Sequence, residues 1–155
     1  MFNFFKPKNK PRTMLDDVQD VGGRLIVKGY RKIAIQHDCA PTGKTSDEKI
    51  IEIHTSVGRA FSQAAERRGE RLTALVQNYI VLKFLQVYEM LGEERLQGHL
   101  QYEVDKYLAE GLRADYKQEL PLFDPESNDP DVIRLTELHK LTREALEREF
   151  SVKRK

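Results

Sequence analysis

The stretch EKIIEIHTSVGRAFSQAAERRGERLTALVQNYIVLKFL, residues 48–85, decides the fold because its periodicity changes along its length. Residues 49–55 are short, β-branched and loosely alternating, a pattern typical of a strand. From Val57 onward apolar residues recur at helical spacing until Gly69 interrupts the run. A second helical face then continues as far as Gly92. We therefore expect a strand followed by two helices with a tight turn between them.

A helix that begins before residue 48 is the main alternative to this strand. Thr45 is followed three residues later by Glu48, which fits the capping box found at helix N-termini. The sequence alone leaves both structures open for residues 48–54.

The flanking segments complete the expected fold class, which is mainly α with a small β component. Residues 1–23 are expected to form a flexible basic arm. Residues 24–45 are expected to form a short β and turn segment, with one or two strands over residues 24–36, which are rich in β-branched and aromatic residues. The strand-helix-helix core at 46–92 is followed by two further amphipathic helices. These occupy a helical extension at 93–120 and, after a loop at 121–130, a C-terminal helix at 131–150. Asp129 and Pro130 suit the start of that last helix.

Composition restricts the classes of function. The 155-residue chain has a net charge of +1, so it lacks the overall positive field that would draw it to nucleic acid or membranes. Its single cysteine, Cys39, cannot form an internal disulfide, which favours a reducing, cytoplasmic location. No window is long and apolar enough to span a membrane, so we expect no integral membrane association.

The stretch APTGKT, residues 40–45, resembles part of a phosphate-binding loop, but the rest of that motif is missing. The loop requires a glycine five residues before Gly43, and this position holds Asp38. The histidines at 37, 54, 99 and 139 show no metal-ligand spacing. We found no nucleophile paired with a base. The sequence therefore predicts no enzyme, no metal site and no cofactor.

Residues 46–85 resemble the ribbon-helix-helix family, the Arc and MetJ type of DNA-binding proteins. The resemblance rests on the apolar ladder and on AERRGERLTALVQNYI, residues 65–80. It implies an intertwined homodimer, since one strand alone cannot bury its apolar face. The expected dimer core comprises Ile51, Ile53, Val57, Phe61, Leu72, Leu75, Val76 and Tyr79.

The resemblance also implies DNA contacts. The base-facing strand positions would be Glu48, Ile50 and Glu52, which departs from the basic and amide residues usual in the family. The candidates for contact with DNA phosphates are Lys44, Lys49, Arg59, Arg67, Arg68, Arg71 and Thr73. The chain is therefore expected to bind double-stranded DNA as a dimer, as a transcriptional regulator or a plasmid or phage DNA-handling accessory factor.

Two other functions remain open from the sequence. The glutamates at 48 and 52 and the near-neutral charge favour a non-catalytic helical scaffold or adaptor that uses the same dimer ribbon for assembly and binds no DNA. The C-terminal helices offer a surface for a protein partner. A subunit or inhibitor of a larger enzyme complex is the third alternative.

Overall fold

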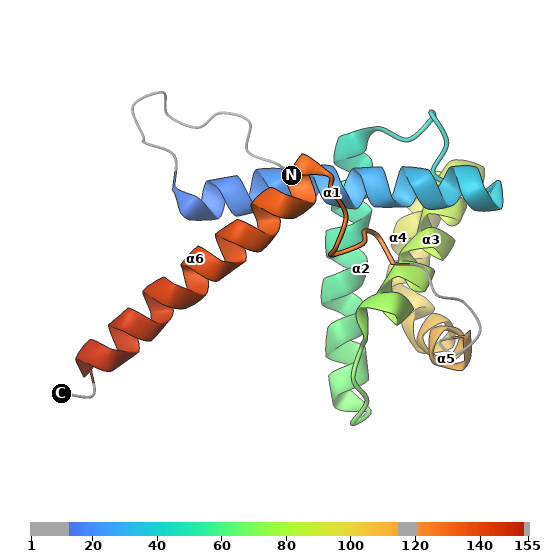
Figure 1. The fold of residues 1–155 in the computed structure, drawn as a ribbon. Helices are drawn as coiled ribbons and strands as arrows, with labels where there is room; N and C mark the ends of the chain where they lie inside the picture. The colour runs from blue at the N-terminus through green and yellow to red at the C-terminus, as the bar shows by residue number, and fades with distance from the viewer. Residues whose placement is uncertain (1–12, 115–120, 154–155) are drawn as a thin grey trace. The chain divides into compact units, whose positions relative to one another are not determined.

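The computed structural model describes residues 13–114 and 121–153, and within those ranges it contains six helices and no strand (Figure 1). The described residues divide into two compact units, one formed from residues up to 25 together with those from 123 onward, and one formed from residues 26–122. The helices are α1 (Met14–His37), α2 (Asp47–Arg67), α3 (Ala74–Leu91), α4 (Glu93–Tyr102), α5 (Val104–Ala114) and α6 (Pro130–Lys153).

The strands expected over residues 24–36 and 49–55 are wrong, because the first segment lies inside α1 and the second inside α2. Ser46 is the N-cap of α2, and its hydroxyl accepts a hydrogen bond from the Lys49 amide at 3.2 Å. Acidic residues in the first turn complement the helix dipole. The helical alternative was thus correct for residues 48–54, although Ser46 and not Thr45 is the cap.

The predicted β component and the ribbon-helix-helix resemblance are also wrong, since the described residues provide no strand from which to build a ribbon. Ile50, Ile53, Val57 and Phe61 recur at steps of three and four, and all are buried on one face of α2. Ile51, which alternates with Ile53 in the expected strand, is only half-buried. The strand was predicted because residues 49–55 are rich in β-branched residues, although their apolar side chains also fit a helical period.

The basic arm predicted for residues 1–23 is only partly described. Residues 1–12, with the basic side chains of that prediction, lie outside the described residues. Residues 14–23 are helical and form the first turns of α1, preceded by reciprocal hydrogen bonds between Thr13 and Asp16. Of the extension expected at 93–120, residues 115–120 also lie outside the described ranges.

The larger unit packs α2 through α5 and residues 26–37 of α1 around one apolar core. In Figure 1, α2 and α3 run side by side in opposite directions. Phe84 on α3 is fully buried and joins two neighbouring helices. Its ring centroid lies 5.6 Å from that of Phe61 on α2 and 4.8 Å from that of Tyr107 on α5. Aromatic contacts at these separations add to the stability gained from burial alone.

Gly111 lets α5 approach α3 closely. A Cβ at residue 111 would lie 3.0 Å from Ile80 Cδ1 and 3.1 Å from Val76 Cγ1. At Gly98 on α4, by contrast, an added Cβ meets nothing within 4 Å. We expect Gly111→Ala to be less stable than Gly98→Ala by about 1–3 kcal/mol, because both gain helix propensity but only the first overpacks the core. Urea unfolding of the two variants measures this difference, and equal stabilities would contradict the close packing.

The smaller unit is a pair of helices, the first turns of α1 and the whole of α6. Val21 and Leu25 on α1 pack against Val132, Leu135 and Leu138 on α6. The two segments run antiparallel, as shown by the contacts at either end. The Arg24 guanidinium binds the Asp131 carboxylate at 3.0 Å, and the Thr142 hydroxyl contacts Met14 Sδ at 3.1 Å. Beyond Thr142, α6 continues past the start of α1 (Figure 1).

None of the helices in the described ranges combines the length and the apolar composition that crossing a membrane requires.

Candidate functional site

The loop that resembles a phosphate-binding motif is occupied by a carboxylate from this same chain. Glu89 on α3 accepts hydrogen bonds from the Thr42 amide at 2.7 Å, the Thr42 hydroxyl at 3.0 Å and the Thr45 hydroxyl at 2.6 Å. Arg31 on α1 donates to the carbonyl oxygens of Thr42 and Thr45. The Thr42 and Thr45 donors of the loop thus bind a carboxylate of the same chain, and the glycine that the phosphate-binding motif requires is replaced by Asp38.

Removing this carboxylate should destabilise the loop. Thr45 is buried at 1% exposure, and its hydroxyl would lose its partner in a Glu89→Ala variant. Because hydrogen bonds to charged groups contribute about 1.5–3 kcal/mol and a buried unpaired hydroxyl is costly, we expect unfolding free energy to fall by about 2–3 kcal/mol. Chemical denaturation measures the loss. Glu94→Ala, at an exposed position on α4, is the matched control. A similar small effect in both variants would contradict the stabilising role of the Glu89 hydrogen bonds.

A chain of polar side chains runs through the core of the larger unit. Tyr30 Oη lies 2.7 Å from His54 Nδ1 and donates to Asn78 Oδ1 at 3.3 Å, while Gln77 Nε2 lies 3.5 Å from His54 Nε2. One proton arrangement satisfies every contact: Gln77 donates to Nε2, Nδ1–H donates to Tyr30, and Tyr30 donates to Asn78. This arrangement requires a neutral imidazole. The four side chains join α1, α2 and α3.

Burial acts on both ionisable groups in this chain. It lowers the pKa of His54 and raises the pKa of Tyr30 well above its ordinary value. Both shifts favour the neutral forms that the hydrogen bonds require. Tyr30 and His54 therefore have a structural role in holding α1 against α2.

The His54 shift predicts acid sensitivity. The unfolded chain takes up a proton on this histidine below its ordinary pKa near 6.5, whereas the folded chain resists protonation until lower pH. Unfolding free energy should therefore fall as pH drops below about 6.5, by up to about 1.4 kcal/mol per pH unit from this group. Denaturation between pH 7.5 and 5 measures it. His54→Gln should reduce the slope, and His139→Gln, at an exposed position, should keep it; equal slopes would refute the assignment.

The three residues predicted to face DNA bases lie on α2. Glu48 and Glu52 are exposed, whereas Ile50 is fully buried in the core and cannot face any partner. Lys49, a predicted phosphate contact, binds Glu93 at 2.5 Å and Glu52 at 3.3 Å. Partial burial opposes its charge, but these carboxylates outweigh that effect and raise its pKa. Lys49 is thus engaged within the protein.

The other predicted phosphate contacts are separated. Lys44 lies in the loop before α2 and Arg59 near the middle of α2, and both are exposed. Thr73 caps α3, since its hydroxyl accepts from the Val76 amide at 3.2 Å. Three arginines do gather at the corner between α2 and α3, around Gly69 with its φ of +69°. They are exposed, and they are Arg67, Arg68 and Arg71.

The residues predicted to form a dimer core are buried to different extents within the larger unit of this chain. Four are buried within the core of the larger unit, namely Ile53, Val57, Phe61 and Val76. The remaining four are half-buried, namely Ile51, Leu72, Leu75 and Tyr79.

A shallow groove of about 280 Å³ lies between α2 and the junction of α4 and α5. Arg67 and Asp105 bring opposite charges to it, and Tyr102 is 78% exposed. The sequence did not indicate this groove, because its walls come from α2 and from the junction of α4 and α5, which are far apart in the sequence. The other lining residues are Ala60, Gln63, Leu100, Gln101 and Val104.

Within the ranges that the structure covers, no three His, Cys, Asp or Glu side chains are placed to hold a metal ion. Burial, followed by the charges of Asp38 and Glu89, raises the pKa of the Cys39 thiol, so a reactive thiolate is disfavoured.

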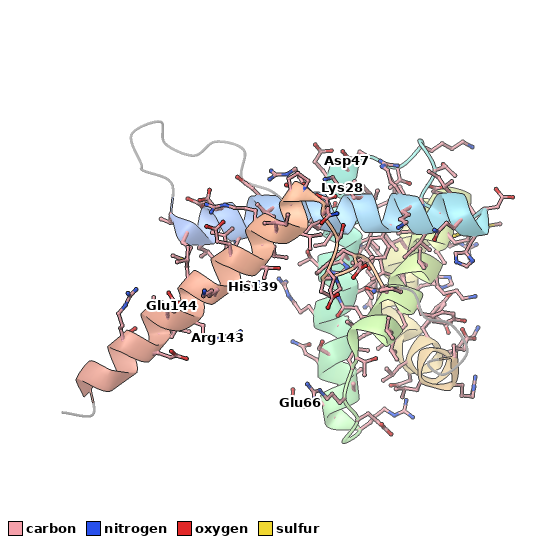
Figure 2. All side chains as sticks on the ribbon, viewed as in Figure 1. Lys28, Asp47, Glu66, His139, Arg143 and Glu144 are labelled. Carbon is pink, nitrogen blue, oxygen red and sulfur yellow. The ribbon has the colours of Figure 1, made fainter. Side chains whose placement is uncertain are left out.

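The most exposed helical segment is the C-terminal part of α6. Every side chain from 139 to 149, which we call the α6 extension, is exposed. Leu141 is 39% and Leu146 49% exposed, and Ala145 lies between them on the same face. Figure 2 shows Arg143 and Glu144 on this part of α6.

No protein-family model, curated protein or solved structure matches this chain.

We therefore compare the candidate sites by their hydrogen bonding, charge and exposed apolar surface. Thr42 and Thr45 of the loop and the polar chain around His54 make their hydrogen bonds within the chain. The groove beside Tyr102 is shallow and lined by balanced charges. The α6 extension presents apolar side chains on a regular helix with no other described segment covering them, which makes it the best candidate for binding another chain.

Proposed function

We propose that this chain is a non-catalytic helical interaction protein that binds another protein through the α6 extension. The observation that carries the proposal is the exposure of Leu141 and Leu146 on a continuous helix. An amphipathic helix of this kind binds by laying its apolar residues into a matching surface.

The interior of the larger unit supports a structural role more than a catalytic one. Its most perturbed groups, Tyr30 and His54, bind each other and are held neutral, and Tyr30 is fully buried. A catalytic acid or base must reach its substrate. Glu89 is likewise committed to its loop. The scaffold protein expected from the sequence would assemble through a dimer ribbon, whereas the protein proposed here would bind its partner through a helix.

Site-specific photocrosslinking in extracts of the source cells tests the proposal. A benzoyl-phenylalanine placed at Ala145 should give discrete adducts, and the adducts should disappear when Leu141 and Leu146 are also changed to glutamate. The same photocrosslinker at Lys32, an exposed residue of α1, is the control for random contacts. Adducts at residue 145 no stronger than at residue 32 would contradict the proposal.

DNA binding is a second candidate, favoured by the arginine corner of Arg67, Arg68 and Arg71. Exposed guanidinium groups beside a helix N-terminus suit phosphate contacts, although Glu66 and Glu70 reduce the local charge. The test is binding to random duplex DNA as salt rises. Arg68→Ala with Arg71→Ala should lower the salt slope by about two units, since each phosphate contact contributes about one. Arg95→Ala is the control, and no binding at low salt excludes this candidate.

A further inference from the structure

The groove between α2 and the junction of α4 and α5 lies entirely within the larger unit. On α2, its lining residues Ala60, Gln63 and Arg67 are spaced by three and four residues and therefore share one face of the helix. The opposite wall is the short junction where α4 ends and α5 begins. His99 Nδ1 lies 2.9 Å from Tyr107 Oη and bridges this junction, which holds the second wall in place.

The buried and exposed lining residues of the groove differ in chemistry. Its floor consists of half-buried apolar side chains at the edge of the core, namely Ala60, Leu100 and Val104. Its rim consists of exposed polar side chains, namely Gln63, Arg67, Gln101, Tyr102 and Asp105. Within the part of the chain that the structure describes, these rim side chains form no hydrogen bond or ion pair with other residues. The rim therefore has hydrogen-bonding groups to offer a ligand.

The charges of the rim favour a ligand that carries both signs. Arg67 suits a carboxylate, which a guanidinium group binds through paired hydrogen bonds. Asp105 suits an ammonium or a guanidinium group. A nucleic acid strand carries only negative backbone charges, so Arg67 would attract it and Asp105 would repel it. Opposite charges around one groove thus favour a polypeptide over a nucleic acid.

The uncharged rim residues match a peptide backbone. The side chains of Gln63 and Gln101 each carry a donor and an acceptor, the same two kinds of group that a peptide unit presents. Tyr102 is 78% exposed and offers its ring as an apolar surface to a ligand side chain. Tyrosine and arginine are also among the residues that contribute most to the binding energy of protein interfaces.

From these observations we propose that the groove binds a short extended segment of another polypeptide, in which an acidic and a basic side chain lie within a few residues of each other. The acidic side chain pairs with Arg67 and the basic one with Asp105. The groove of about 280 Å³ is smaller than the roughly 300–1,000 Å³ of typical ligand sites, so binding is weak, with a dissociation constant of about 1 mM. Because the groove and the α6 extension share no residue, this binding does not depend on the proposed function.

Nuclear magnetic resonance titration of the isotopically labelled full chain with blocked tripeptides tests the proposal. The probes are acetyl-Glu-Ala-Lys-amide and its diacidic, dibasic and neutral counterparts, in which Glu, Lys or Gln occupies both outer positions. The mixed-charge peptide should shift the amide signals of residues 60–67 and 100–105 and bind at least about threefold more tightly than the other three. No shift of these signals by any probe up to about 20 mM, or equal affinities for all four, would overturn the proposal.

Single substitutions test the roles of the two charges. Arg67→Gln should weaken the mixed-charge peptide about three- to tenfold and make the dibasic peptide the preferred probe, whereas Asp105→Asn should favour the diacidic peptide. Both residues are exposed, so circular dichroism should show unchanged helix content. Arg95→Gln, at an exposed position on α4 outside the groove, is the matched control and should bind as wild type does.

Two further outcomes would also overturn the proposal. One is an unchanged order of peptide affinities in both groove variants, which would show that these charges do not select the ligand. The other is a shift of the same signals by a thymidine oligonucleotide but by none of the peptides, which would assign the groove to nucleic acid.

Discussion

Tyr30→Ala is expected to lower the free energy of unfolding by about 3–5 kcal/mol, the range for deleting a large buried aromatic side chain. Tyr30 has no exposed surface and lies where α1 crosses α2 and α3. Its loss opens a cavity and removes a hydrogen-bond partner from both His54 and Asn78. Urea denaturation followed by circular dichroism measures the change.

Tyr30→Phe separates the two contributions. It keeps the ring contact with His54, whose centroid is 5.5 Å away, but removes the hydroxyl. We expect a loss of about 1–3 kcal/mol, because a buried donor or acceptor then lacks its partner. Tyr88→Phe, at a half-buried position on α3, is the control. If Tyr30→Phe is as stable as wild type, the hydrogen-bonded chain through His54 does not contribute to folding.

Phe84→Ala is expected to cost a similar amount, about 3–5 kcal/mol. The Phe84 ring links α3 to Phe61 on α2 and to Tyr107 on α5, so its removal loosens three helices together. Thermal and urea unfolding both measure the effect. Tyr102→Ala removes an aromatic ring that is 78% exposed and should change stability by less than about 0.5 kcal/mol. Similar losses in the two variants would contradict the placement of Phe84 at the core.

The helical periods after Val57 were readable from the sequence because apolar residues recur there at helical spacing. The strands predicted for residues 24–36 and 49–55 were wrong for a common reason. Both are short and rich in β-branched residues, and intrinsic strand preference is easily overridden when one face is buried against other helices. The burial of Ile50, which faces away from the core in the strand register, is the clearest example.

The internal contacts of the candidate sites could not be read from the sequence. Glu89 meets Thr42 and Thr45 across more than 40 residues of chain, and Tyr30 meets His54 across 24. No local pattern signals such pairs. The apolar residues of α6 were visible as a periodic face, but which of them are covered by α1 depends on the tertiary fold.

Residues 48–54 are helical and belong to the core of a single chain. Nuclear magnetic resonance of the isotopically labelled protein tests it most directly. Helical Cα chemical shifts from 48 to 54, with cross-peaks from His54 to Tyr30, are the predicted result. Extended chemical shifts over these residues, with cross-strand contacts between two copies in a mixed-label sample, would contradict the helix and show that residues 48–54 form a dimeric ribbon.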